Sequence, residues 1–200
     1  MIAIKGLWWP DGVRSSQCDH SLTHVRSVEW AIAHCPQKRT AVQAGGNVGL
    51  WPRRLSEVFA RVITFEPDVV TRECLLANAP TVEARWEALG DRPGVCALDR
   101  QSLGSHRVTA GDSVPVTTID ALALTDLDFL QLDIEGYEWH ALAGAVETIE
   151  RCCPLIQVEL RGFTKAYGKS DFDVQALLAS FGYREVSQQP GNDVVFEVAA

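Results

Sequence analysis

The sequence predicts an α/β fold in which a mostly parallel, doubly wound sheet carries helices on both faces. Apolar, β-prone runs alternate with segments of helical pattern about five times along the chain. Several of these runs are apolar almost throughout, as expected for strands buried on both faces. The chain finishes on two β-prone runs around Pro190-Gly191-Asn192, which predict an antiparallel strand near one edge of the sheet.

Length and composition are those of a single globular domain. The 200 residues are 46% hydrophobic and 22% charged, which is ordinary for such a protein. The net charge of −8 disfavours non-specific binding to nucleic acid, which relies on a basic surface. No apolar run reaches the length of a membrane span, and the first residues do not form a secretory signal. We therefore expect no membrane partner and a cytoplasmic location.

The six cysteines include no C-x-x-C pair, so a zinc site built on close pairs is not indicated. We expect them to be reduced thiols.

Residues 1–39 are expected to form an N-terminal arm and a helix that pack on the main body, residues 40–200. The arm is a strand or hairpin at residues 2–9. The helix is predicted at residues 21–35, with Ser21 as its N-cap.

In the main body, strands and helices are predicted in alternation by their hydrophobic spacing. A hairpin is predicted at residues 94–118, where β-prone pieces are separated by turn residues. The predicted strands are 40–44, 61–67, 81–89, 127–136 and 154–160, and the predicted helices are 49–60, 68–79, 137–151 and 171–182. Two final strands are predicted within 183–199.

The stretch AVQAGGNVGLWP, residues 41–52, places Gly45, Gly46 and Gly49 where a strand passes into a helix. In a doubly wound sheet, ligands bind outside the carboxyl ends of the strands, and glycine lets a ligand approach the backbone closely. The spacing is G-x-x-x-G rather than the G-x-G-x-x-G of dinucleotide-binding loops. Glu66 ends the second strand of the sheet, where an acid can accept the hydroxyls of a ribose. An adenosine without a pyrophosphate site predicts S-adenosylmethionine, although a tight turn followed by a surface glutamate remains the alternative.

Acidic residues end two further strands. Asp133 and Glu135 occur in LQLDIEGYE, and Gly136 indicates that the chain turns there. We expect one of the two acids to face the ligand and the other to cap the next helix, with two plain helix caps as the alternative. Glu159 ends the fifth strand and is either a site residue or a partner of a helix N-terminus.

These segments carry a resemblance to a known family. AVQAGGNVGLW, ITFEPD, EALGD, VPVTTIDAL, LDFLQLDIEGYEWHALAGA and PLIQVEL occur in the order, and near the spacing, of the FkbM family of S-adenosylmethionine-dependent methyltransferases. The resemblance covers about residues 40–198, and the first forty residues, with Trp8-Trp9-Pro10, resemble the leader of phage-encoded or bacterial members. It implies a class I methyltransferase (Rossmann-like) fold of seven strands, the last antiparallel. It also implies methyl transfer to a hydroxyl of a sugar, glycan or small natural product.

The resemblance also implies a role for individual residues. The loop under the methionine moiety would be Gly45, Gly46, Asn47 and Gly49, the ribose would be held by Glu66 and Pro67, and the adenine flanked by Glu87, Ala88 and Leu89. Asp133 would lie beside the reacting methyl. The family usually has Asp at the position of Gln43, which we still expect to bind the cofactor, and Lys at the position of Gln131.

Asp133 is the first candidate for the base that removes the acceptor proton, followed by Glu135 and Glu159. The absence of a D-D pair at this rim predicts a site without metal. His20 and His24 are further residues that could reach a substrate. We expect acceptor selection in loop 161–170 and at the two tryptophans of the arm.

Two other functions remain open from the sequence. One is a module that binds S-adenosylmethionine without turnover, for which Gln43 is the main argument. The other is a methyltransferase with a nucleic-acid or protein acceptor, although the sequence has no N-P-P-Y-like or D-P-P-Y-like motif for amino methylation.

Overall fold

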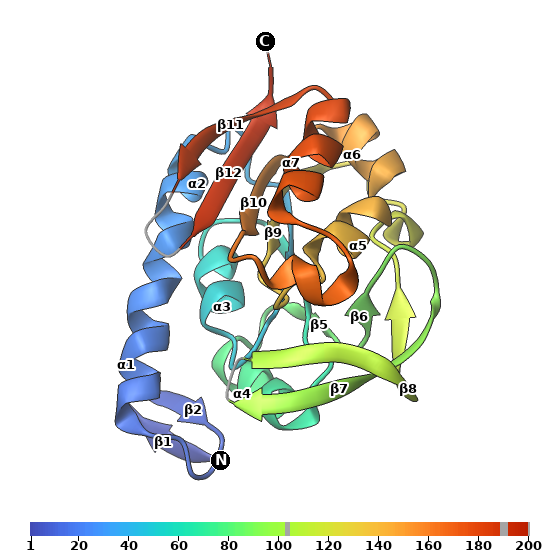
Figure 1. Cartoon of the computed structure of the whole chain (residues 1–200). Coiled ribbons are helices and arrows are strands. Elements are labelled where there is room, and N and C mark those ends of the chain that lie inside the picture. The colour runs from blue at the N-terminus through green and yellow to red at the C-terminus, as the bar shows by residue number, and fades with distance from the viewer. Residues whose placement is uncertain (103–104, 189–191, 200) are drawn as a thin grey trace.

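A computed structural model describes residues 1–102, 105–188 and 192–199 of the chain. Its main sheet has seven strands (Figure 1), which lie side by side in the order β11 (Tyr183–Gln188), β12 (Asp193–Val198), β10 (Leu155–Glu159), β9 (Leu127–Leu132), β3 (Thr40–Ala44), β4 (Arg61–Phe65) and β5 (Glu83–Arg85). β12 runs antiparallel to both of its neighbours, and the pairs from β10 to β5 are parallel. The predicted fold class is confirmed, including the antiparallel last strand. The turn predicted at Pro190 and Gly191 lies outside the described residues.

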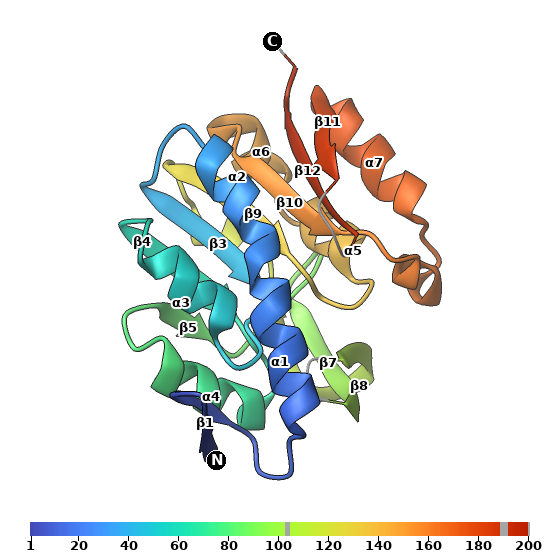
Figure 2. The same cartoon turned by 90° about the vertical axis from the view of Figure 1, so that its left-hand side faces the viewer.

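Helices cover both faces of this sheet. On one face lie α1 (Ser15–His24), a short 3-10 helix (Val25–Ser27), α2 (Val28–His34) and α3 (Leu50–Ser56), seen in front of the sheet in Figure 2. On the other face lie α5 (Glu138–Ala143), α6 (Val146–Cys152) and α7 (Asp171–Ser180), and α4 (Val69–Asn78) packs beside β5 and α3. Further 3-10 helices span Asp120–Leu122 and Phe163–Tyr167.

The alternation of side chains along the central strands divides the core between these two faces. Val42 and Leu130 pack with residues of α5, α6 and α7, whereas Ala41 and Phe129 pack with residues of α2 and α3. Neighbouring residues of one strand therefore serve opposite layers, which is why β3 and β9 are buried throughout.

Several element boundaries differ from the sequence prediction, and three of the differences change the arrangement of elements. The first helix begins at Ser15, so Ser21 lies inside it, and the Gln17 side chain accepts a hydrogen bond from the Arg14 backbone nitrogen at 3.0 Å to close its first turn. The helix predicted at 137–151 is divided between α5 and α6, because the backbone at Gly144 passes so close to Gly90 that a Cβ would lie 2.1 Å from its oxygen. A local helical pattern does not record such a contact.

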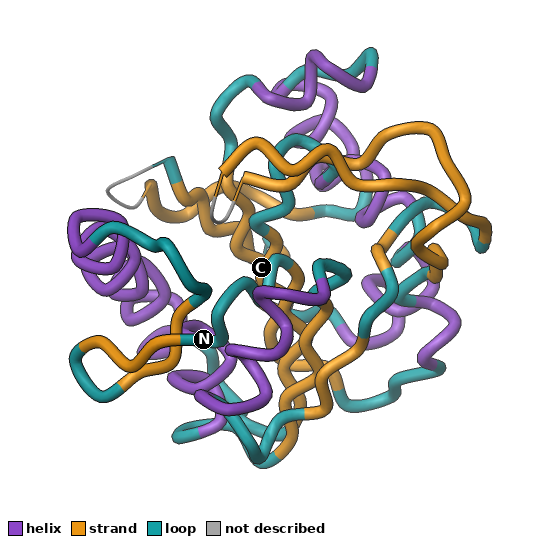
Figure 3. The backbone as a smooth tube through the Cα atoms, turned by 90° about the horizontal axis from the view of Figure 1, so that it is seen from below, coloured by secondary structure: helices purple, strands orange, loops and turns teal. Residues whose placement is uncertain are grey.

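The strand predicted at 81–89 is also divided, between β5 in the main sheet and β6 (Ala88–Leu89). β6 pairs with the hairpin formed by β7 (Gly94–Ser102) and β8 (Ser105–Thr117), which confirms the hairpin predicted at 94–118. The resulting small sheet lies across the end of the main sheet at which the parallel strands finish (Figures 1 and 3). It therefore covers the carboxyl ends of these strands.

The N-terminal arm is a hairpin of β1 (Ile2–Ile4) and β2 (Leu7–Trp9). The side-chain amide of Asn78 in α4 accepts from the Trp8 backbone nitrogen and donates to its backbone oxygen, both at 2.8 Å. Trp9 is fully buried and Trp8 is exposed. The Asn78 side chain thus makes the pair of hydrogen bonds to the Trp8 backbone that a neighbouring strand would otherwise make.

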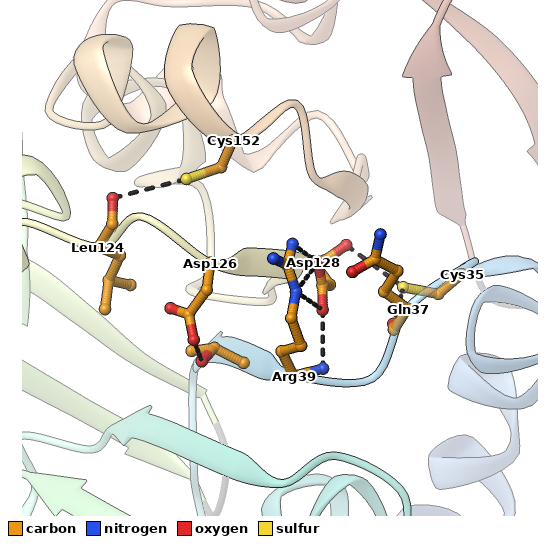
Figure 4. Close-up of polar contacts among 8 residues, drawn as sticks. Cys35, Gln37, Arg39, Leu124, Asp126, Asp128 and Cys152 are labelled. Carbon is orange, nitrogen blue, oxygen red and sulfur yellow. Dashed lines mark hydrogen bonds and ion pairs between the residues drawn. The ribbon is translucent and has the colours of Figure 1, made fainter.

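Polar contacts at the opposite end of the sheet join the starts of β3 and β9 (Figure 4). The Asp128 carboxylate accepts from the Arg39 backbone nitrogen at 2.7 Å and from its Nη2 at 2.6 Å, and Asp126 accepts from the Thr40 hydroxyl at 2.9 Å. The Cys35 thiol donates to the Asp128 backbone oxygen at 3.3 Å. These contacts fix the register of the two strands, so their carboxyl ends finish level with one another.

All six cysteines are free thiols. Within the described residues, no helix combines the length and the apolar character needed to cross a membrane.

Candidate functional site

Two adjoining pockets open at the carboxyl ends of the parallel strands. The first is enclosed by the ends of β3, β4 and β9, by β6 and by the hairpin residues Leu98, His106 and Val108. The second is enclosed by α1, the loop after β3 and the ends of β9 and β10. Asn47, Trp51, Asp133 and Glu135 line both pockets. A ligand in one pocket can therefore touch a ligand in the other at these four residues.

The glycine loop after β3 is shaped by contacts within the protein. A Cβ added at Gly45 would lie 1.9 Å from the backbone oxygen of Asp133, and one at Gly46 would lie 2.5 Å from a methyl group of Leu75. Gly49 has a φ of +90°, and its Cβ would lie 2.9 Å from the Leu75 Cα. Gly45 lines the first pocket, Gly46 the second and Gly49 neither. Close contacts within the protein therefore explain why these positions are glycines, and the approach of a ligand to their backbone stays a prediction.

The predicted ribose-binding acid, Glu66, lies in the wall of the first pocket. It is 5% exposed, and its carboxylate accepts from the backbone nitrogens of Asn47 at 2.6 Å and Asp68 at 2.8 Å. Burial raises the pKa of Glu66 to about 7, and the two backbone hydrogen bonds oppose that shift. The group is thus a firmly held carboxyl that changes its charge near neutral pH. The predicted cofactor residues Pro67, Glu87, Ala88 and Leu89 line the same pocket.

Two buried polar atoms in the shared wall have no hydrogen-bond partner among the described residues. They are Asn47 Oδ1, an acceptor, and Trp51 Nε1, a donor. Buried polar groups are normally paired, so these two indicate that a polar ligand completes the site. Asn47 was predicted from the family resemblance. Trp51 was not, and the signal that could have found it is its place in the first turn of the helix after the glycine loop.

The loop that follows β9 is folded by Glu138. This buried carboxylate accepts from the backbone nitrogens of Ile134 at 3.0 Å and Gly136 at 3.1 Å, and burial raises its pKa to about 7. Glu135 and Gly136 both have positive φ, which turns the chain back sharply. Asp133 and Glu135 both line the pockets. The expected division of roles between these two acids is therefore wrong, because the residue that caps the turn is Glu138.

Acidic and basic side chains from separate elements meet at the floor of the second pocket. The potential ligand atoms of His24, Asp133 and Glu159 all lie within 4.8 Å of one another. Arg161 donates to Glu159 Oε1 at 3.2 Å, and His24 Nε2 lies 3.3 Å from Asp193 Oδ2. Burial raises the pKa of Asp133, and burial together with the Asp133 charge raises that of Glu159. Each of these two carboxylates therefore disfavours ionisation of the other.

Other residues expected at the site lie elsewhere. The Gln43 side chain is fully buried within the sheet, donates to the Ala44 backbone oxygen at 3.0 Å, accepts from the Thr64 hydroxyl, and lines neither pocket. Trp8 and Trp9 line neither pocket, and Arg161 is the residue of loop 161–170 that lines the second one. The N-terminal segment contributes through α1 instead, whose residues His20, Ser21 and His24 line the second pocket.

Comparisons with known proteins agree with this architecture. The sequence profile of the family described as "Methyltransferase FkbM domain" matches residues 60–185. The structure is similar to that of methyltransferase FkbM from Methylobacillus flagellatus KT, with a TM-score of 0.55, 18% identity, and coverage of 80% of this chain and 43% of that one. The chain thus spans less than half of that protein.

Two further solved structures are similar over most of their length. Magnesium protoporphyrin IX methyltransferase (ChlM) from Synechocystis PCC 6803, with bound SAM, has a TM-score of 0.54 and 15% identity, covering 96% of this chain and 87% of that one. DesVI from Streptomyces venezuelae has a TM-score of 0.56 and 10% identity, covering 94% and 99%. At these identities the likeness concerns the fold. No protein of curated function matches the sequence.

Proposed function

Because this chain belongs to the FkbM family of S-adenosylmethionine-dependent methyltransferases, we propose that it methylates a hydroxyl group of a sugar, glycan or small natural product. The observation that supports this proposal most is the pair of adjoining pockets with four residues in common. Methyl transfer is a direct displacement, so the donor and the acceptor must meet in line at one point. Asp133 and Glu135 are the acids at the junction.

The first pocket fits S-adenosylmethionine. The unpaired Asn47 Oδ1 and Trp51 Nε1 offer an acceptor for an ammonium group and a donor for a carboxylate, the two charged groups of its methionine part. Glu66 retains free lone pairs for the ribose hydroxyls. Ala88 and Leu89, with Leu98 of the hairpin, supply apolar walls for a flat ring.

When bound, the cofactor supplies a methyl group on a sulfonium, which is already a good leaving group. The residues of the chain are then needed to orient the acceptor and to remove its proton. We assign that role first to Asp133, which lines both pockets, and retain Glu135 as the second candidate. Glu159, which lines the second pocket alone, is a further candidate.

The walls of the second pocket support a hydroxyl-bearing acceptor. They include His20, Ser21, Glu159 and Arg161, which offer both donors and acceptors of hydrogen bonds. Such a lining suits a molecule with several hydroxyl groups.

A screen for transfer of labelled methyl groups tests the proposal. We expect label from S-adenosylmethionine in at least one sugar, glycan or hydroxylated natural product, and label that accumulates about 10²–10⁴-fold more slowly when Asp133→Asn replaces the wild type. Transfer to peptides or nucleic acids alone would contradict the choice of acceptor. Tight binding of the cofactor without transfer to any class would instead favour the module without turnover.

The affinity for S-adenosylmethionine is expected to rise about tenfold between about pH 6 and pH 8. The ionised Glu66 carboxylate accepts both ribose hydroxyls, whereas the protonated form has one oxygen acting as a donor. Because its pKa is raised to about 7, the competent form grows from a minority to a large majority over this range. Calorimetry at several pH values measures the effect. Glu66→Gln should bind S-adenosylmethionine more weakly, with an affinity that does not change with pH. Glu73→Gln, which alters an exposed acid, should keep the pH dependence of the wild type. A slope that persists in Glu66→Gln would assign the titration to another group.

A further inference from the structure

Three side chains that lie far apart in the sequence, His24, Asp133 and Glu159, line the second pocket, and the buried Asp193 lies against His24. His24 comes from α1, Asp133 follows β9, Glu159 ends β10 and Asp193 begins β12. One potential ligand atom from each of His24, Asp133 and Glu159 lies within 4.8 Å of the others. Asp193 is next to them, with its Oδ2 at 3.3 Å from His24 Nε2. The cluster is therefore one imidazole among three carboxylates.

Asp193 is the most unusual member of this cluster. Its side chain is 0% exposed, and neither carboxylate oxygen receives a hydrogen bond from a described residue. It also stands directly opposite Glu159 in the antiparallel pair of β10 and β12, where like charges repel. A buried acid in such surroundings needs a compensating positive charge. His24 is its contact among the described residues, and Arg161 is committed to Glu159.

A second observation concerns the residues just below the acids. Gln131 and Gln157 are paired neighbours in β9 and β10, and both are fully buried. Each precedes an acid of the cluster by two positions, so each lies on the same face of the sheet as that acid. The side-chain nitrogen and oxygen atoms of both glutamines have no hydrogen-bond partner in the described part of the chain. The floor is thus polar and has unused capacity to hold water or another polar ligand.

We propose that His24, Asp133 and Glu159 bind one divalent cation in the second pocket, with Asp193, whose Oδ2 lies 3.3 Å from His24 Nε2, supplying further negative charge. Ligand atoms held at roughly 2.0–2.6 Å from one cation lie no more than about 5 Å from one another. The three ligand atoms of the cluster, all within 4.8 Å of one another, meet this condition. One imidazole with carboxylates suits Mn²⁺, Fe²⁺ or Zn²⁺. The second pocket gives the cation a path of entry.

This inference rests on the proposed function for its role, because the cation would face the acceptor and hold one of its oxygens beside the methyl group. Each residue needs to offer only one ligand atom. The second oxygen of Asp133 therefore stays available to the acceptor hydroxyl. The sequence predicts a site without metal because it shows no adjacent pair of acids, whereas these ligands come from separate elements.

Direct titration with Mn²⁺ tests the site without any need for activity. The full-length protein is freed of metal with a chelator, and Mn²⁺ binding is followed by electron paramagnetic resonance and calorimetry. We expect a single Mn²⁺ per chain, with affinity at least about tenfold weaker in Glu159→Gln and in His24→Ala. Glu150→Gln, which alters an exposed acid on α6, should bind Mn²⁺ as the wild type does. Circular dichroism and cofactor affinity show whether each variant is folded.

A chelator-treated wild type that takes up no stoichiometric Mn²⁺, Mg²⁺ or Zn²⁺ would overturn the proposal. So would equal Mn²⁺ binding by folded Glu159→Gln and the wild type. In either case protons rather than a metal ion balance the negative charge of the cluster, and His24 and Asp193 form an imidazole–carboxylate pair with no role in metal binding. Stoichiometric Mn²⁺ binding without methyl transfer to any acceptor would support the cation site while contradicting the proposed function.

Discussion

Replacing Asp133 with asparagine is expected to lower the rate of methyl transfer by about 10²–10⁴-fold, the usual contribution of a general base. The substitution preserves the size of the side chain and much of its hydrogen bonding, but it removes the charge and the basicity. Asp133 lines both pockets, so the loss should fall on the chemical step. Affinity for S-adenosylmethionine should fall far less.

Single-turnover kinetics at saturating cofactor separates the two effects. Asp112→Asn, the same chemical change at an exposed position in β8, is the matched control and should behave as the wild type. The rate should stay low when Mn²⁺ is added in excess, because the proton acceptor is missing as well as a cation ligand. A drop in cofactor affinity with normal saturated turnover would mean that Asp133 holds the methionine ammonium. If cofactor affinity and saturated turnover were both normal in Asp133→Asn, the role of base would pass to Glu135.

Gly45→Ala is expected to destabilise the fold by more than about 4 kcal/mol, which is exceptional for a single substitution. The added Cβ would lie 1.9 Å from the backbone oxygen of Asp133, and φ at this position is +86°. Neither the end of β3 nor that of β9 can move aside, because Gly45 N donates to the Phe65 oxygen at 3.1 Å and Asp133 N donates to the Ala44 oxygen at 3.1 Å. The clash is therefore with fixed backbone rather than with a flexible side chain.

Gly162→Ala separates the clash from the strain of the left-handed backbone. Gly162 has a φ of +74°, and an added Cβ would meet nothing within 4 Å. The Gly162→Ala variant should lose only about 1–2 kcal/mol of folding stability. Urea unfolding followed by circular dichroism compares the two variants. If Gly45→Ala is as stable as Gly162→Ala but binds S-adenosylmethionine poorly, the glycine is there for the ligand after all.

Much of the fold was predictable because its signals are local. The runs at 40–44, 61–67 and 127–136 are apolar enough to predict buried strands, and Asp68 was expected near the start of α4, where it accepts from two backbone nitrogens. The predictions that failed depended on contacts at a distance. Gly144 divides a helix because Gly90 lies against it, and β6 leaves the main sheet because β8 offers it a partner.

The candidate site divides in the same way. Glu66 and Asp133 were expected from their places at strand ends, and both line the first pocket. Trp51 and His24 gave a weak signal or none, since a tryptophan or histidine on a helix is usually a packing or surface residue. Gln43 was expected at the cofactor, but its side chain is fully buried within the sheet. The side of the strand to which it points decided the case of Gln43, and the place where a helix packs on the sheet decided those of Trp51 and His24.

The sequence by itself determined the succession of strands and helices along the chain, the glycine turn after β3, the acids at the strand ends and the family to which the chain belongs. Each of these depends on residues close together in the chain, through hydrophobic periodicity, backbone freedom or a motif. Only the tertiary structure decided which side chains share a site. The order of the strands within the sheet and the path of α1 across it result from the packing of side chains on both faces of the sheet, which sums many weak contacts. That packing, which no local pattern records, brings His24 and Asp193 to Asp133 and Glu159.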